Sequence, residues 1–125
     1  MTTDANAARP ALRLRIRVMR DGDVLFGPGK ADVLEAIRDS GSMAAAGRRL
    51  GMSYQRTHDL VAAMNAQFAE PVVAPAKGGS RGGGSLLTPF GEQVLATYRE
   101  IEALAEAATA AKIGWLQARL AGTAA

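Results

Sequence analysis

Apolar residues recur along this chain with two different periods, and each change of period marks a predicted element. From residue 12 to residue 18, leucine, isoleucine and valine alternate with arginine, the pattern of a strand with one buried face. Asp21-Gly22 is a frequent two-residue hairpin turn, so residues 24–26 are expected to return as a second strand. The fold is therefore predicted to begin with a β-hairpin, which the Gly-Pro-Gly of residues 27–29 closes.

Helical spacing of apolar residues begins after the hairpin. Residues 30–40 are predicted to form a supporting helix whose inward face holds Ala31, Leu34 and Ile37. Two more helices are expected on either side of Gly51, because glycine adopts the positive φ that often ends a helix. Ser42 and Ser53 stand where their side-chain oxygens can cap the first turns of these helices. The stretch therefore predicts a helix-turn-helix.

The second helix of this pair has an apolar face and a polar face. Its apolar stripe is predicted to hold Thr57, Val61, Met64 and Phe68, packed on the shorter helix through Met43, Ala46, Gly47 and Leu50. The polar face begins in the first turn and carries Tyr54, Gln55, Arg56, His58 and Asp59. At the start of a helix that lies in a major groove, such side chains can contact base edges and phosphates. A face that meets only solvent is the alternative.

Two short strands, at residues 72–74 and 85–87, are predicted to flank a glycine-rich basic segment at 76–84. Glycine-rich loops can also bind nucleotides, but a P-loop requires glycine-lysine-serine or threonine leading into a helix, and this loop leads into a strand. The better interpretation is a wing, a hairpin whose tip lies on the DNA backbone. Lys77, Ser80 and Arg81 would then contact phosphate or the minor groove.

The last predicted helix is long for so small a core. Thr88 is its expected N-cap and Pro89 its first residue, and Gly114 is a predicted interruption. An apolar seam follows the helix past the compact domain, which favours burial against a second copy of the chain. The expected dimer contacts are Val94, Tyr98, Ile101, Ala105 and Ala108. A helix folded back on its own domain is the alternative.

Composition narrows the classes of function. The 125 residues carry a formal net charge of +3 with arginine and lysine gathered before the last helix, which suits a surface facing phosphates. Without cysteine, and with His58 as the single histidine, no enzyme, metal site or cofactor is predicted. No apolar run reaches membrane-spanning length and no signal-peptide core is present, so a cytoplasmic protein with no membrane partner is expected.

The order of these elements and several short motifs match a known family. The motifs are Gly41-Ser42-Met43, Gly51-Met52-Ser53-Tyr54, Met64-Asn65, the glycine runs at 78–79 and 82–84, and Leu87-Thr88-Pro89-Phe90-Gly91. Over roughly residues 12–105 the chain resembles the DNA-binding domain of ModE-type molybdate-responsive regulators, whose winged helix is related to that of LysR-type regulators. His58 and Pro75 depart from the family pattern, which has an aromatic residue and commonly a basic residue there.

The resemblance implies a mainly α winged helix-turn-helix. The expected division is a disordered tail at 1–11, a DNA-binding domain at 12–88, a dimerisation helix at 89–120 and a tail at 121–125. It also implies a homodimeric transcription factor, more often a repressor, on a palindromic operator in double-stranded DNA. By position, the resemblance places Ser53, Tyr54, Gln55 and Arg56 at the start of the recognition helix and Lys77 and Arg81 in the wing. With Ser42, His58 and Ser80, these are the expected DNA contacts.

Full-length ModE-type regulators continue into domains that bind molybdate, so here a stand-alone regulator of molybdate, oxyanion or metal-homeostasis genes is expected. Its effector stays unknown. Control could come from the protein's own abundance, from a small ligand at the dimer interface or from a separate sensor chain.

The alternative function is a protein-interaction adaptor, whose long helix pairs with a different chain and whose winged helix binds no specific DNA. Steep salt dependence would distinguish DNA binding from an apolar helix interface.

Overall fold

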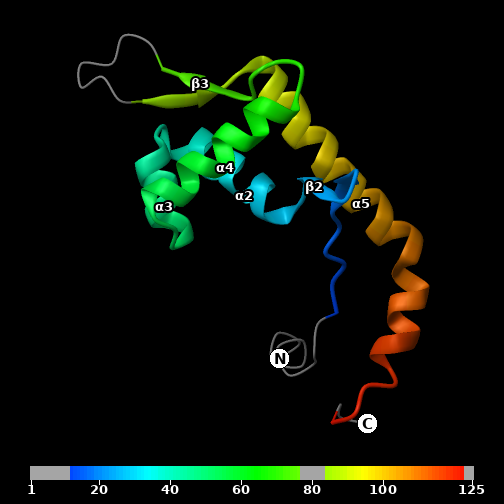
Figure 1. Cartoon of the computed structure of the whole chain (residues 1–125). Coiled ribbons are helices and arrows are strands. Elements are labelled where there is room, and N and C mark those ends of the chain that lie inside the picture. Colours follow the sequence, from blue (N-terminus) through cyan, green and yellow to red (C-terminus); the bar gives the residue numbers. More distant parts are fainter. Residues whose placement is uncertain (1–11, 77–83, 123–125) are drawn as a thin grey trace.

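The computed structural model of the protein describes residues 12–76 and 84–122. Its elements are β1 (Val18–Arg20), β2 (Asp23–Phe26), α2 (Pro28–Ser40), α3 (Met43–Leu50), α4 (Tyr54–Gln67), β3 (Val73–Pro75), β4 (Ser85–Leu87) and α5 (Pro89–Gln117). β1 pairs with β2 and β3 with β4, each as a separate antiparallel sheet. In Figure 1, α3, α4 and the strands β3 and β4 lie on one side, and α5 runs along the other. The predicted fold class, a mainly α winged helix-turn-helix, is confirmed.

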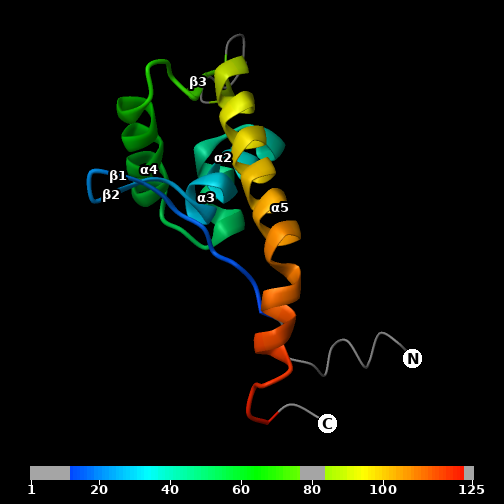
Figure 2. The ribbon, with the colours of Figure 1, turned by 90° about the vertical axis from the view of Figure 1, so that its right-hand side faces the viewer.

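The N-terminal hairpin is shorter than the alternating pattern predicts. β1 begins only at Val18, because β2 ends at Phe26 and offers no partner for earlier residues. Residues 12–17 are extended all the same, with apolar side chains half-buried and arginines exposed in alternation. They run beside α5 (Figure 2), where the Ile16 carbonyl accepts a 2.6 Å hydrogen bond from the Tyr98 hydroxyl. The apolar side chains are thus covered by a helix face and not by a sheet.

α2 forms the centre of the core. The three residues predicted to face inward, Ala31, Leu34 and Ile37, are each 0% exposed. The helix begins at Pro28, whereas the sequence predicts a turn there and a start at Lys30. Proline suits the first helical position because its φ is already helical and its missing N–H has no intrahelical acceptor.

The helix-turn-helix is confirmed with the predicted caps. The Ser42 side chain accepts a 3.0 Å hydrogen bond from the backbone N–H of Ala45, and that of Ser53 accepts one of 3.0 Å from Arg56. Gly51 between the helices has φ of +71°, the left-handed conformation predicted for it. The start of α4 is therefore fixed by local chemistry.

α3 and α4 approach closely where they cross. A Cβ on Gly47 would stand 2.9 Å from the Thr57 hydroxyl and 3.0 Å from the Met52 carbonyl, so only glycine fits without a shift. Thr57 is fully buried, and its hydroxyl donates to the Ser53 carbonyl at 3.0 Å. The polar atom is satisfied inside the crossing.

An aromatic cluster joins the hairpin, α4 and α5. Phe26 meets Tyr98 and Phe68 edge to face, with ring centroids 5.1 and 6.4 Å apart, and Phe68 meets Phe90 at 5.8 Å. Burial raises the pKa of the Tyr98 phenol, which is 2% exposed. Leu95, which the predicted seam omits, is also buried. The N-terminal half of α5 thus belongs to the core.

α5 continues through Gly114, so the predicted interruption there is wrong. One glycine costs a helix only about 1 kcal/mol, which a helix of this length tolerates. Arg99 ties α5 to α2: its guanidinium lies 3.0 Å from Glu35 and 3.2 Å from Asp32, and the bond to Glu35 raises the pKa of Arg99 still further. Among the described helices, none has the length and hydropathy to cross a membrane.

The first turn of α5 touches the chain that precedes β3. The Thr88 hydroxyl donates to the Pro71 carbonyl at 2.7 Å and accepts from the Gly91 N–H at 2.9 Å, as its predicted cap role requires. A Cβ on Gly91 would collide with the Val72 carbonyl oxygen. Because that neighbour is backbone, it cannot turn aside.

Gly91→Ala should therefore destabilise the fold by about 3 kcal/mol or more, since the added methyl must displace backbone. Gly114→Ala is the matched control in the same helix: nothing lies within 4 Å of the point that the new Cβ would occupy, so the free energy of unfolding should rise by about 0.5–1 kcal/mol. Urea unfolding followed by circular dichroism measures both. Equal effects of the two variants would contradict the close approach at Gly91.

Candidate nucleic-acid interface

The outer face of α4 begins at its capped N-terminus and is polar. Tyr54, Gln55, Arg56, His58 and Asp59 are all exposed, as the sequence predicts. Tyr54, a large ring, is 54% exposed in the first turn of the helix. Arg56 forms no ion pair within the described residues. This turn therefore offers hydrogen-bonding groups and a positive charge to a partner surface.

Asp59 bonds to one of these side chains and lies near another. Its carboxylate accepts a 2.8 Å hydrogen bond from the Gln55 amide, one helical turn earlier, and lies 3.8 Å from Nδ1 of His58. The His58 ring lies 6.0 Å from that of Tyr54, measured between centroids. An amide whose N–H₂ is engaged keeps its carbonyl oxygen as an acceptor. The face is thus partly preorganised before any ligand arrives.

The strands β3 and β4 stand beside this helix. The sequence predicts strands at 72–74 and 85–87; the second is confirmed, and the first lies one residue later, at Val73–Pro75. A shallow groove of about 390 Å³ separates the strands from α4, with Tyr54, His58 and Ala62 on one wall and Pro75 on the other. Lys77, Ser80 and Arg81 lie outside the described residues, so their predicted contacts stay predictions.

Asn65 joins β3 to α4, a role that its pairing with Met64 in a sequence motif does not reveal. Its amide oxygen accepts from the N–H groups of Val72 and Val73 at 2.8 and 3.3 Å, and its NH₂ donates to the Val73 carbonyl at 3.1 Å. On the other strand, the Ser85 N–H donates to the Gly41 carbonyl at 2.8 Å. The base of the strand pair is therefore held to α4 and to the C-terminal end of α2.

Further basic residues lie on the same unit. Arg48 and Arg49 end α3 and are exposed, and Arg49 lies 3.9 Å from Asp39. A cation near a helix C-terminus is favoured by the helix dipole, so these arginines also have a local stabilising role. The helix-turn-helix nevertheless presents positive charge at the C-terminal end of α3, from Arg48 and Arg49, and at the N-terminal end of α4, from Arg56.

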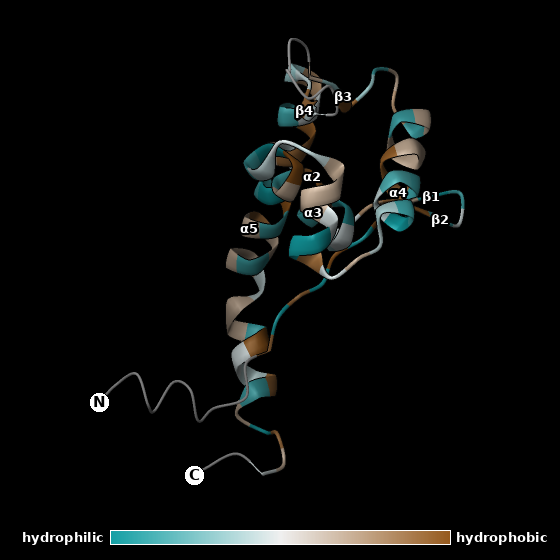
Figure 3. Ribbon diagram, turned by 90° about the vertical axis from the view of Figure 1, so that its left-hand side faces the viewer, coloured by the Kyte–Doolittle hydropathy of each residue, from teal (hydrophilic) through white to brown (hydrophobic). Residues whose placement is uncertain are grey.

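The residues expected at a dimer interface differ in exposure. Tyr98 is buried in its own chain and bonded to Ile16, so its ring is not available to a second copy. Val94 and Ala105 are half-buried, while Ile101 and Ala108 are exposed. Figure 3 shows apolar positions continuing along α5 below the compact domain. What remains of the predicted seam is an exposed stripe beside Tyr98.

Comparison with solved structures identifies the class of fold. The DNA-binding domain of CbnR, solved in complex with DNA, superposes with a TM-score of 0.56 over 70% of this chain and 95% of that domain, at 23% identity. Full-length LysG of Corynebacterium glutamicum, a LysR-type transcriptional regulator, gives a TM-score of 0.53 over 74% of this chain and 30% of LysG, at 25% identity. The described chain is thus a winged helix-turn-helix of the LysR type.

No protein-family model matches the chain, but curated relatives do. MopB of Rhodobacter capsulatus, a molybdenum-pterin-binding protein, is 48% identical over 78 residues, which cover 62% of this chain and 29% of MopB. ModE of Azotobacter vinelandii, a molybdenum transport protein, is 35% identical over 94 residues, which cover 74% of this chain and 35% of that ModE. ModE of Escherichia coli K12, a DNA-binding transcriptional dual regulator, is 32% identical over 71 residues, which cover 57% of this chain and 27% of that ModE.

The chain is a homologue of the ModE-type molybdenum regulators, as its motifs indicate. The matching region spans only about a third of the length of these relatives.

Asn65→Ala should lower the free energy of unfolding by about 2–3 kcal/mol, because it leaves Val72 and Val73 without their side-chain partner. Asp59→Ala, on the exposed face of the same helix, should change it by less than about 0.5 kcal/mol. Hydrogen exchange measures the local effect: the amides of Val72 and Val73 should lose protection in the first variant only. Unchanged protection would show that Asn65 does not hold β3.

Proposed function

We propose that the protein is a sequence-specific DNA-binding transcriptional regulator that acts as a homodimer on a palindromic operator. The observation that supports this most directly is the exposed, capped first turn of α4, which stands beside the base of a strand pair in the arrangement of a winged helix-turn-helix. Homology to ModE of Escherichia coli, named a DNA-binding transcriptional regulator, supports the same conclusion. The DNA-binding domain of CbnR shares the fold.

In this proposal α4 enters the major groove by its N-terminal end. Arg56 and Gln55 meet base edges, for which guanidinium and amide groups have matching donor and acceptor patterns. Tyr54 and His58 contact the DNA strand that passes between α4 and β3, since both side chains line the groove between these two elements. Ser42 and Ser53 keep a hydroxyl proton free to donate to phosphate, because their oxygens act as acceptors in the caps. Lys77, Ser80 and Arg81 contact the backbone or minor groove.

The dimer forms through α5. Residues 12–88 then act as the DNA-binding domain, and 89–120 as the dimerisation segment. Burial of an exposed apolar stripe provides the driving force, and a two-fold axis presents one α4 to each half-site. Two half-sites bound together gain affinity that a monomer lacks, because the second contact becomes intramolecular.

The regulated genes are proposed to serve molybdate, another oxyanion or a metal. This rests on the names of the relatives, one of which is a molybdenum transport protein. Repression is the proposed default, as a dimer bound across a promoter blocks access to it. Regulation by abundance is favoured slightly over an effector at the dimer interface or a separate sensor chain.

Fluorescence anisotropy of the protein on its own upstream DNA, against a scrambled duplex, tests the proposal. Binding should be selective and should weaken steeply as salt rises, since phosphate contacts release counterions. Parallel titrations with and without molybdate show whether this chain responds to it. Equal affinity for both duplexes, together with a salt-insensitive partner captured on α5, would favour the adaptor alternative.

Arg56→Ala should weaken operator binding by about 1–3 kcal/mol and leave the fold intact, because the side chain is exposed. Arg20→Ala removes the same charge at the opposite end of α4, where Arg20 bonds to Gln67, and should leave affinity nearly unchanged. Anisotropy titrations at fixed salt compare the two variants. Equal losses would mean that net charge, and not the first turn of α4, governs binding.

Ile101→Glu should break the dimer and with it high-affinity operator binding, because a charge would have to be buried in the apolar interface. Ala107→Glu adds the same charge to an exposed position roughly a quarter turn from the stripe and should leave the dimer intact. Sedimentation equilibrium gives the association state of each variant. An intact Ile101→Glu dimer would place the interface elsewhere.

A further inference from the structure

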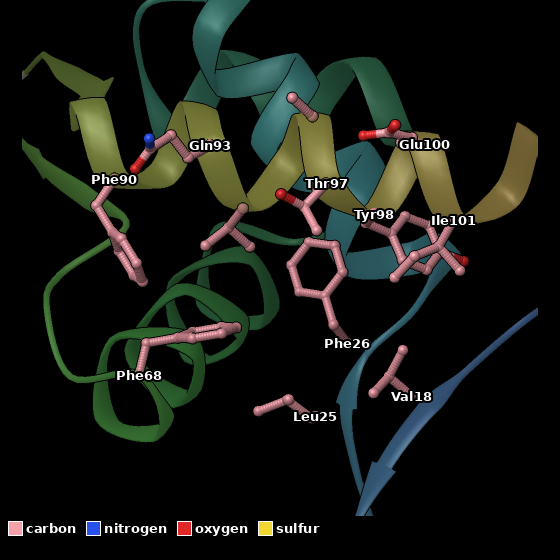
Figure 4. A pocket seen from close by; sticks show the side chains of 12 residues that line it. Val18, Leu25, Phe26, Phe68, Phe90, Gln93, Thr97, Tyr98, Glu100 and Ile101 are labelled. Atoms are coloured by element: carbon pink, nitrogen blue, oxygen red, sulfur yellow. The ribbon is translucent and has the colours of Figure 1, made fainter. Parts of the chain in front are cut away.

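An open apolar groove lies between α5, the N-terminal hairpin and the end of α4. Its volume is about 610 Å³. Figure 4 shows Leu25, Phe26 and Phe68 on one side of this space, and Phe90, Thr97 and Ile101 of α5 on the other. Aromatic and aliphatic surface of this size is costly to leave in water, so the groove is suited to an apolar occupant.

The same face of α5 continues as an apolar stripe beyond the compact domain. Its members follow one another at alternating steps of four and three residues, which keeps them in line on a helix: Thr97, Ile101, Leu104, Ala108, Ala111 and Trp115. Leu104 is 64% exposed and Trp115 is 57% exposed. The stripe therefore starts at the apolar groove and ends at the exposed indole ring of Trp115.

The spacing of hollow and ring fits a two-fold axis. Trp115 lies 18 residues after Thr97, one of the α5 residues that line the groove, and so about 27 Å further along the helix. If two α5 helices pair antiparallel with Trp115 opposite Thr97, the axis passes at the level of residue 106, between Leu104 and Ala108 of the stripe. Leu104 of each helix then stands opposite Ala108 of the other, so the small side chain leaves room for the large one.

We propose that the apolar groove is the receptor for Trp115 of a second copy of this chain. The inference deepens the proposed homodimer and rests on it. Each copy supplies one ring and one groove, so a symmetric pair satisfies both at once and leaves no copy free to recruit a third. A parallel pair would instead set ring beside ring and groove beside groove, leaving both grooves empty.

The chemistry of ring and groove is complementary. The indole body packs among phenyl rings, while Gln93 and Glu100 at the groove edge offer oxygen acceptors for its N–H. Arg119 stacks on Trp115, 4.1 Å from the ring centroid, and so brings a positive charge toward the groove that Glu100 lines. When the Trp115 ring is buried in the groove, Arg119 is therefore brought close to Glu100 of the other copy.

Trp115 is the single tryptophan of the chain, so its fluorescence reports this site alone. On dilution of the dimer, its emission should shift to longer wavelength, and quenching by iodide should increase, as the ring returns to water. Trp115→Ala should weaken dimerisation by at least about tenfold, the loss typical of a central interface tryptophan. Leu116→Ala, which shortens the neighbouring exposed side chain off the stripe, is the matched control.

A mixing experiment tests the orientation. Thr97→Arg should block the groove and weaken the dimer, but it keeps Trp115; Trp115→Ala keeps an open groove but has no ring. Mixed together, the two variants should form a heterodimer with one intact site. The only tryptophan present should then shift to shorter wavelength. Circular dichroism checks that each variant is folded.

The outcomes separate two failures. A wild-type dimer whose tryptophan stays water-exposed, or whose Trp115→Ala variant dimerises as well as wild type, would overturn the groove assignment and leave the homodimer standing. Absence of complementation between variants that each weaken the dimer would likewise overturn it. A wild-type chain that sediments as a monomer, free and on operator DNA, would overturn the proposed homodimer itself.

Discussion

The contact between Phe26 and Tyr98 joins the two ends of the described fold. Phe26 ends the N-terminal hairpin, and Tyr98 lies in the third turn of α5, with ring centroids 5.1 Å apart. The Tyr98 hydroxyl also holds Ile16 by a 2.6 Å hydrogen bond. Because α2 follows directly from the hairpin, this contact and the ion pairs of Arg99 fix α5 relative to α2. The outer face of α5 is thereby left for a partner.

The side of the molecule formed by α3 and α4 depends on backbone anchoring. Serine caps set where α4 begins, and Asn65 holds β3 beside it through bonds to Val72 and Val73. The first turn of α5, at Gly91, packs on the Val72 carbonyl. The spacing between α4 and the strands is therefore set by hydrogen bonds and close backbone contact, so the exposed side chains of α4 can vary without disturbing the fold.

α5 has two roles that its single apolar pattern does not separate. In its first half, Leu95 and Tyr98 face the core, and the neighbouring stripe borders the aromatic groove. In its second half the same stripe extends beyond the domain, where Leu104 and Trp115 are exposed. A helix whose apolar surface exceeds what its own domain can cover is suited to association, and the proposed pairing uses both halves together.

By itself, the sequence determined the local structure of this protein. The caps at Ser42, Ser53 and Thr88, the turn at Gly51 and the buried face of α2 were all predictable, because each depends on a few neighbouring residues. The exposed polar face of α4 followed from the same helical periodicity. The class of fold and the family were also accessible, since several such motifs occur in a fixed order.

Tertiary structure decided what depends on residues far apart in the chain. Alternation at residues 12–18 specifies one buried face but not what covers it. α5 covers much of that face, and the expected strand over these residues is reduced to its last part. Periodicity could not tell that Tyr98 faces its own core while Ile101 faces outward, because both lie in one apolar seam. The roles of Asn65 and Gly91 likewise appear only once β3 is brought against α4 and α5.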